Sequence, residues 1–194
     1  FLDGLIPHMY EGKLEGKLYF KGEDITEKLP KYRCENIGFV MQNPESQFCT
    51  FTVEEELAFG MENLGISVEE MKSRIKQGLN YVGMSGCESI DLNRLSGGQK
   101  QKIAIASILV MEPEVLLLDE PTANLDPISR KEIFCLISRL AYEKKMTIII
   151  VEHNLEEMLD QVDYILMLNG EGKVIASGKG AKVKQLFFER QAVY

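Results

Sequence analysis

The sequence predicts an α/β fold in which a mostly parallel sheet is flanked by helices. Apolar runs typical of strands alternate with segments whose apolar residues recur at helical spacing. The runs at 115–118 ("VLLL") and 147–151 ("TIIIV") are apolar at consecutive positions, which is typical of strands that are covered on both faces. We also expect a small antiparallel β element and a mostly helical segment beside this sheet.

The first half of the chain is expected to hold short strands followed by helices. Residues 13–25 are β-prone and contain a glycine before an acidic stretch, which predicts one or two antiparallel strands. Residues 36–42 predict a short apolar strand that ends at Gln42. From 43 to 94 the segment is expected to be mostly helical, because these apolar residues recur at helical spacing: Val53, Leu57, Ala58, Met71, Ile75, Leu79 and Val82.

The second half predicts the strands and helices of the core. Asp126 is a natural N-cap with Pro127 at the first helical position, so a helix is expected to begin there and run to 145. Its buried stripe is expected to be Ile133, Leu136, Ile137, Leu140 and Ala141. The other expected elements are helices at 97–111, 154–161 and 181–190, strands at 114–120 and 146–153, and a hairpin at 163–178 turned at 169–172. We therefore divide the chain into a core (1–42 and 95–194) and a helical part (43–94).

Composition limits the possible functions. The formal net charge is −8, which argues against bare duplex nucleic acid as the main partner. The four cysteines form no C-x-x-C pair and have no histidine at zinc spacing, so we expect free thiols. Apolar runs are far shorter than the roughly 20 residues that cross a bilayer, so a membrane role is expected to come through a partner.

Polar residues follow three of the apolar runs. Gln42 follows "IGFVM", Asp119 and Glu120 follow "VLLL", and His153 follows "TIIIVE". Right-handed crossovers place the carboxyl ends of parallel strands at one edge of the sheet, where ligands bind. We therefore expect these four side chains to face one crevice.

These residue types fit phosphate chemistry. A carboxylate such as Asp119 can coordinate magnesium, and an adjacent one such as Glu120 can orient or deprotonate a water for attack on a γ-phosphate. Gln42 can reach the metal or the water through its amide, and a neutral His153 imidazole can donate to the γ-phosphate. The alternative is that solvated loop acids and polar residues simply close the strands. His8 has no such context and is taken as structural or exposed.

The stretch "LSGGQKQ" (95–101) predicts an anion site at a helix start. Ser96 is expected to cap the helix while Gly97 and Gly98 bare the backbone amides, which point at an anion together with the positive helix end. The alternative is an ordinary serine cap followed by a flexible glycine pair.

Five motifs in this order resemble those of the ATP-binding-cassette (ABC) ATPases. "LSGGQ" is similar to the signature motif, "VLLLDE" to the Walker B strand, "ANLD" to the D-loop, "VMQNPESQF" to the Q-loop and "IIVEH" to the switch-histidine strand. The resemblance implies a P-loop NTPase (RecA-like) core, a helical signature subdomain and a head-to-tail dimer of cassettes. It also implies ATP and Mg²⁺ as ligands and transmembrane transporter subunits as partners.

The resemblance gives each site residue a role. Asp119 is expected to hold magnesium, Gln42 to link the metal to the transmembrane partner, Glu120 to be the general base and His153 to contact the γ-phosphate. Asp126 is expected to contact the neighbouring subunit. The signature residues are expected to complete the site of the opposing chain: Ser96, Gly97, Gly98 and Gln99.

The expected function is that of an ATP-hydrolysing subunit, peripheral on the cytoplasmic face of the cell membrane. "QNPESQF", "EELAFGMENLG" and "VEHNLEE" resemble the energy-coupling-factor branch, whose ATPases power uptake of vitamins and metal ions. A soluble ABC-family ATPase of DNA repair or translation, or a non-catalytic regulatory module, would carry the same motifs. The transported substrate, and whether the dimer is homo- or heteromeric, stay open.

The 194 residues contain no G-x-x-x-x-G-K-[ST] phosphate loop. The resemblance implies that this Walker A loop lies just before Phe1. The 194-residue chain alone is therefore expected to bind ATP poorly.

Overall fold

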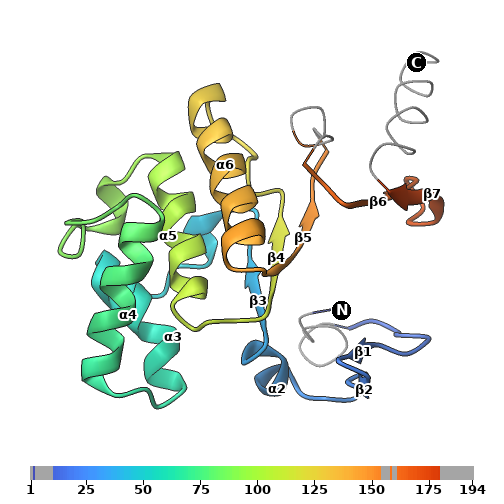
Figure 1. The fold of residues 1–194 in the computed structure, drawn as a ribbon, viewed down its shortest axis with the longest axis horizontal. Coiled ribbons are helices and arrows are strands. Elements are labelled where there is room, and N and C mark those ends of the chain that lie inside the picture. The colour runs from blue at the N-terminus through green and yellow to red at the C-terminus, as the bar shows by residue number, and fades with distance from the viewer. Residues whose placement is uncertain (1, 3–10, 154–157, 159–160, 180–194) are drawn as a thin grey trace. The chain divides into compact units, whose positions relative to one another are not determined.

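The computed structural model describes residues 2, 11–153, 158 and 161–179 (Figure 1). The chain forms two compact units, Phe1–Val151 and Glu152–Tyr194. The expected helices at 154–161 and 181–190, and His8, fall on residues outside those described, apart from positions 158 and 161.

The first unit is built on a three-stranded parallel sheet with the order β3-β4-β5. The strands are β3 (Ile37–Val40), β4 (Val115–Asp119) and β5 (Thr147–Val151). Val40 pairs with Leu118, and Asp119 pairs with Val151, so the carboxyl ends of the three strands meet at one edge. The expected α/β fold with a parallel sheet is confirmed.

Helices α5 (Gly97–Leu109) and α6 (Pro127–Glu143) flank this sheet, and α3 (Val53–Asn63) and α4 (Val68–Tyr81) lie beside α5 (Figure 1). Two short 3₁₀ turns, η1 (Pro44–Ser46) and η2 (Leu92–Arg94), also lie in this unit. The apolar stripes expected on the helical segment are buried, except that Ala58 is half-buried. Residues 43–94 therefore supply a largely helical layer against α5.

Side-chain caps fix where these helices begin. Thr52 and Glu55 form a reciprocal capping box at the start of α3, and Ser96 and Gln99 form one at the start of α5. Asp126 caps α6, with Pro127 at its first position. The two caps expected from the sequence, Ser96 and Asp126, are both confirmed.

The face that α6 buries differs from the expected stripe. Phe134 is buried although it was not expected, whereas Ala141 is exposed. All residues from 141 to 145 are exposed, so the last turn of the helix runs past the elements that cover its earlier turns. Helical spacing predicts in which direction a side chain points, but not how far along the helix other elements pack over that face.

Strand β5 is not covered on both faces by the described residues. Its burial alternates along the strand, and Ile149 and Val151 are 43% and 56% exposed. The expectation of a strand buried on both faces is thus wrong for β5, whereas Leu116, Leu117 and Leu118 of β4 are buried as expected. Edge position alone does not account for this difference, because β3 is also an edge strand of this sheet and its residues are buried or half-buried.

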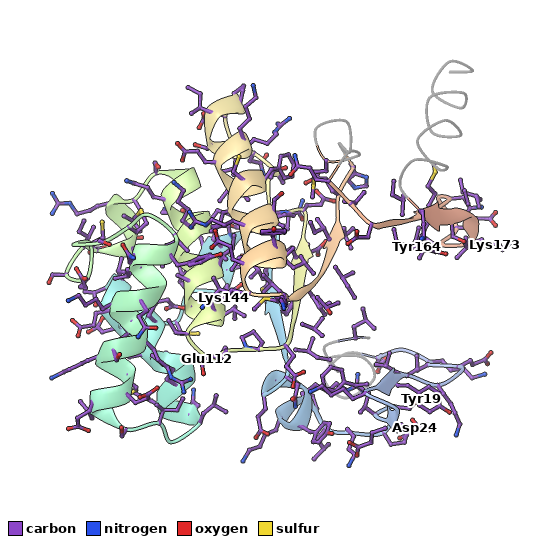
Figure 2. The ribbon with its side chains drawn as sticks, in the orientation of Figure 1. Tyr19, Asp24, Glu112, Lys144, Tyr164 and Lys173 are labelled. Carbon is purple, nitrogen blue, oxygen red and sulfur yellow. The ribbon has the colours of Figure 1, made fainter. Side chains whose placement is uncertain are left out.

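The antiparallel element expected at 13–25 consists of β1 (Tyr19–Phe20) and β2 (Glu23–Asp24). Tyr19 pairs with Asp24, and both side chains are labelled in Figure 2. The five-residue helix α2 (Pro30–Cys34) follows and was not expected from the sequence. Its buried Arg33 guanidinium donates 2.9 Å hydrogen bonds to the carbonyl oxygens of Ile25 and Thr26, which ties α2 to the segment after β2.

The second unit contains the expected hairpin, formed by β6 (Tyr164–Leu168) and β7 (Val174–Lys179). Figure 2 labels Tyr164 and Lys173 on this hairpin. The Gly172 amide donates to the Asn169 carbonyl at 2.9 Å, and Gly172 has φ +75°. The turn at 169–172 is thus confirmed, and glycine suits its left-handed position.

The cysteines and the lengths of the helices bear on two expectations from composition. The four cysteines are free thiols, as expected. Within the described ranges, none of the helices combines the length and the apolar character that a membrane span requires.

Candidate functional site

The carboxyl edge of the sheet brings two of the expected site residues into contact. Gln42 follows β3 by two residues, and Glu120 follows the last residue of β4, Asp119. The Gln42 side-chain amide donates a 2.7 Å hydrogen bond to Glu120 Oε2. The expectation that these side chains converge is confirmed for this pair, across two neighbouring strands.

The backbone of Glu120 is fixed at both ends. Its amide donates to the Val151 carbonyl at 2.8 Å, and its own carbonyl accepts from the Ala123 amide at 3.0 Å. Glu120 has φ +41°, in the left-handed region, which costs a residue other than glycine about 1–3 kcal/mol. These two hydrogen bonds hold the unfavourable conformation, and the carboxylate is therefore aimed by the framework of β4 and β5.

The loop that carries Gln42 is closed by its own side chains. Asn43 accepts from the Glu45 amide at 3.1 Å, and Gln47 Oε1 accepts from the Met41 amide at 3.0 Å. Glu45 forms an ion pair with Lys100 of α5. The loop after β3 is therefore linked directly to α5, the helix that begins at residues 96–99, which we call the signature turn.

A buried carboxylate organises the next part of the loop. Glu56 is 5% exposed and accepts from the Cys49 amide at 3.0 Å and from the Thr50 amide at 3.1 Å. It also accepts from the Thr50 hydroxyl at 2.9 Å. One acceptor on α3 thus satisfies two backbone donors of the loop.

A hollow of about 350 Å³ opens beside this loop, between η1 and the start of α5. Its lining combines aromatic and charged side chains: Glu45, Phe48, Thr50, Phe51, Leu92, Asn93 and Lys100. Phe51 is 77% exposed. Neither Phe51 nor Lys100 was among the expected site residues; the only local signal was an aromatic residue directly before the Thr52 cap.

The signature turn presents most of its groups outward. Ser96, Gly97 and Gln99 are exposed, and Ser96 Oγ accepts from the Gln99 amide while Gln99 Oε1 accepts from the Ser96 amide. Gly98 is buried against Ser129 of α6. The two glycines therefore differ, since only Gly97 lies on the exposed side of the turn.

Asp126 lies at the start of α6 and accepts from the amides of Ile128 and Ser129 at 3.0 Å each. The Ser129 hydroxyl, followed by those amides, holds the pKa of Asp126 below its usual value. Asn124, in the turn before the cap, has φ +61°, a conformation that asparagine adopts more readily than most residues. Asp126 thus stays ionised at the exposed start of the helix.

His153 belongs to the second unit. Its backbone amide donates to the Glu152 carboxylate at 3.1 Å. Its approach to the other site residues stays a prediction.

The donor set at the sheet edge fits magnesium. The described residues hold no group of three or more histidine, cysteine or carboxylate side chains arranged for a metal. Magnesium usually takes only one or two protein carboxylates and fills its other positions with phosphate oxygens and water. Asp119, Glu120 and the amide oxygen of Gln42 are hard oxygen donors of that kind.

With this geometry established, comparison with known proteins identifies the family. The family model described as "ABC transporter" matches residues 5–123. The chain belongs to the ABC transporter family. The solved structures that it resembles are ABC ATP-binding cassettes, which agrees with the expected P-loop NTPase fold.

Two curated ABC relatives illustrate the similarity. A putative ABC transporter ATP-binding protein of Pyrococcus abyssi is 44% identical over 182 residues, which are 94% of this chain and 65% of the relative. The putative HMP/thiamine import ATP-binding protein YkoD of Bacillus subtilis is 38% identical over 178 residues, 91% of this chain and 32% of that protein. The chain therefore spans less than two thirds of the length of these relatives.

Two of the solved ABC structures that the chain resembles are described together with an assembly. CbiO1 from Clostridium perfringens, described as part of the ABC transporter complex CbiONQ, has a TM-score of 0.83 and 32% identity over 99% of this chain and 74% of its own. The cassette MJ0796, a dimer in a post-hydrolysis state with ADP and Pi, has a TM-score of 0.73 and 28% identity over 85% of this chain and 73% of its own.

Proposed function

We propose that the full-length protein is the ATP-hydrolysing subunit of a membrane importer. The observation that carries this proposal is the 2.7 Å hydrogen bond between Gln42 and Glu120, directly beside Asp119 at the carboxyl edge of the sheet. This edge is where parallel α/β sheets bind nucleotides. The match to the ABC transporter family supports the same reading.

In this proposal Glu120 is the general base. Its carboxylate accepts a proton from the water that attacks the γ-phosphate, and its fixed backbone orients that water. The amide of Gln42 holds the Glu120 carboxylate in place. Asp119 and Gln42 would hold Mg²⁺, which when bound neutralises charge on the phosphates. His153 would donate a hydrogen bond to the γ-phosphate.

The signature turn serves a second cassette. Ser96, Gly97, Gly98 and Gln99 complete the ATP site of the opposing chain at a helix start, where Ser96, Gly97 and Gln99 are exposed and Gly98 is buried. Asp126 contacts the same neighbour. The dimeric MJ0796 structure supports this arrangement by similarity. ATP then joins two chains, and its hydrolysis separates them.

The transmembrane partners would choose the cargo, for which we propose a vitamin or a metal ion. The thiamine-import description of YkoD and the place of CbiO1 in a CbiONQ complex support an importer of the energy-coupling-factor kind. The subunit would then lie at the cytoplasmic face of the membrane and couple to the membrane partner through the Gln42 loop.

Purification of the full-length protein from its native membrane tests this proposal. We expect it to co-purify with an integral membrane protein and to hydrolyse ATP. Hydrolysis without any membrane partner would favour a soluble ABC-family ATPase of DNA repair or translation. A membrane complex without hydrolysis would favour a non-catalytic regulatory module.

The 194-residue chain alone is expected to bind ATP weakly, because its sequence has no G-x-x-x-x-G-K-[ST] loop to cradle the phosphates. Titration calorimetry on this chain checks the expectation. A dissociation constant in the micromolar range would contradict it, since such affinity corresponds to about −8 kcal/mol.

A further inference from the structure

The starts of α5 and α6 touch through one glycine. A Cβ atom built on Gly98 would lie 2.6 Å from Ser129 Oγ and 2.8 Å from Ser129 Cβ, while Ser129 Cα would be 3.8 Å away. The first two separations are too short for non-bonded heavy atoms, whereas the third is ordinary contact. Only a residue without a side chain therefore fits at 98 as long as Ser129 keeps its place.

Ser129 is at the same time bound to the cap of its own helix. Its hydroxyl donates to Asp126 Oδ2 at 2.6 Å, and its amide donates to Asp126 Oδ1 at 3.0 Å. The side chain of Ser129 is thus held between Gly98 of α5 and Asp126, the cap of its own helix α6. It has little room to move without breaking one of these contacts.

The neighbouring glycine provides a contrast. A Cβ on Gly97 would meet only Leu125 Cδ2, at 3.5 Å, which is ordinary van der Waals contact. Neither glycine of the pair has a φ in the left-handed region. Backbone conformation therefore does not require glycine at 98, and close packing against Ser129 does.

We propose that Ser129 is a positioning residue, which through its contacts with Gly98 and Asp126 makes the signature turn and the Asp126 cap a single rigid unit. This inference rests on the proposed function, in which both groups face the neighbouring cassette. A displacement of the signature turn then also displaces Asp126. The signature turn and the Asp126 cap therefore approach the partner cassette together.

The first test needs no ATP turnover. The pKa of Asp126 is followed by carbon-detected NMR in the full-length protein. In Gly98→Ala the new methyl displaces the Ser129 hydroxyl from Asp126, so the pKa of Asp126 rises towards its ordinary value of 3.8. The matched control Gly97→Ala leaves that pKa unchanged. An unchanged pKa in Gly98→Ala would overturn the inference.

The second test is a rescue series in ATP hydrolysis by the same protein. Gly98→Ala is expected to lower kcat/KM by roughly tenfold or more, because small displacements of positioned groups are costly. Adding Ser129→Gly removes both clashing atoms and should restore kcat/KM to that of the Ser129→Gly single variant. Adding Ser129→Ala leaves the Cβ at 2.8 Å and should not restore it.

The thermal midpoint of each variant separates positioning from stability alone. If Gly98→Ala/Ser129→Gly recovers the thermal midpoint but its kcat/KM stays below that of Ser129→Gly, the loss of activity does not come from the contact with Ser129, and the positioning role is overturned. Equal rescue by Ser129→Ala and Ser129→Gly would overturn the steric argument. A wild-type protein that does not hydrolyse ATP would refute the proposed function, while the Asp126 titration would still decide whether positions 98 and 126 are coupled.

Discussion

The side-chain amide of Gln42 donates to the carboxylate of Glu120 at 2.7 Å, although 78 positions separate the two residues in sequence. The parallel pairing of β3 with β4 brings them together, because it ends both strands at the same edge. A donor that follows one strand thereby orients an acid that follows its neighbour. The proposed hydrolytic role of Glu120 depends on this contact.

Replacing Gln42 by alanine should slow hydrolysis more than it weakens ATP binding. A hydrogen bond to a charged group is worth about 1.5–3 kcal/mol, so a loss of roughly tenfold or more in kcat is expected. Steady-state kinetics and nucleotide titration of the full-length protein measure both quantities. The control is Gln77→Ala, an exposed glutamine of α4, which should behave as wild type. A Gln42→Ala variant with full turnover would remove the contact from the mechanism.

Replacing Glu56 by alanine should destabilise the first unit strongly. The change would leave the Cys49 and Thr50 amides without their common acceptor, at a cost of about 2–4 kcal/mol in the free energy of unfolding. Glu54→Ala, an exposed acid two positions earlier on the same helix, should stay within about 0.5 kcal/mol. Urea unfolding checks both values. Equal stabilities of the two variants would show that Glu56 does not hold this loop.

The stability contributed by Asp24 should depend on pH in a defined window. The Thr26 hydroxyl, the Thr26 amide and Lys17 lower the pKa of Asp24 from 3.8 to about 2. A carboxyl whose folded pKa is depressed stabilises the fold above its unfolded pKa, and this contribution is lost as the pH falls through the folded pKa. The stability difference between wild type and Asp24→Asn should therefore be full above pH 3.8 and vanish towards pH 2.

The same titration contains its own control. Thr26→Val removes the hydroxyl donor and should raise the folded-state pKa of Asp24. The lower end of the window then moves to higher pH, while the unfolded-state pKa still fixes its upper end. A stability difference that is independent of pH between 2 and 5 would contradict the assigned hydrogen bonds.

Local patterns in the sequence predicted the features that depend on neighbouring residues. The caps at Ser96 and Asp126 follow from residue types within one helical turn. The meeting of Gln42 with Glu120 also followed, because parallel strands have one carboxyl edge whatever their loops contain. These inferences needed no knowledge of how the helices approach one another.

The features that the sequence left unpredicted depend on distances between elements. The side chains of Phe134 and Ala141 point in similar directions from α6, but only Phe134 is buried. The glycine pair predicted two bared amides, whereas Gly98 is packed against Ser129 from a helix 31 positions further along the chain. Spacing within a helix carries no information about such an approach.

ATP turnover by Glu120→Gln in the full-length protein is the sharpest test of whether Glu120 is the general base. We expect ATP binding to be retained and the closed dimer to accumulate, while hydrolysis falls by about 10²-fold or more because the general base is lost. Glu112→Gln is the matched control, since Glu112, which is labelled in Figure 2, is an exposed acid that precedes β4. Glu120 directly follows the other end of that strand. Unchanged turnover in Glu120→Gln would show that Glu120 is not the general base.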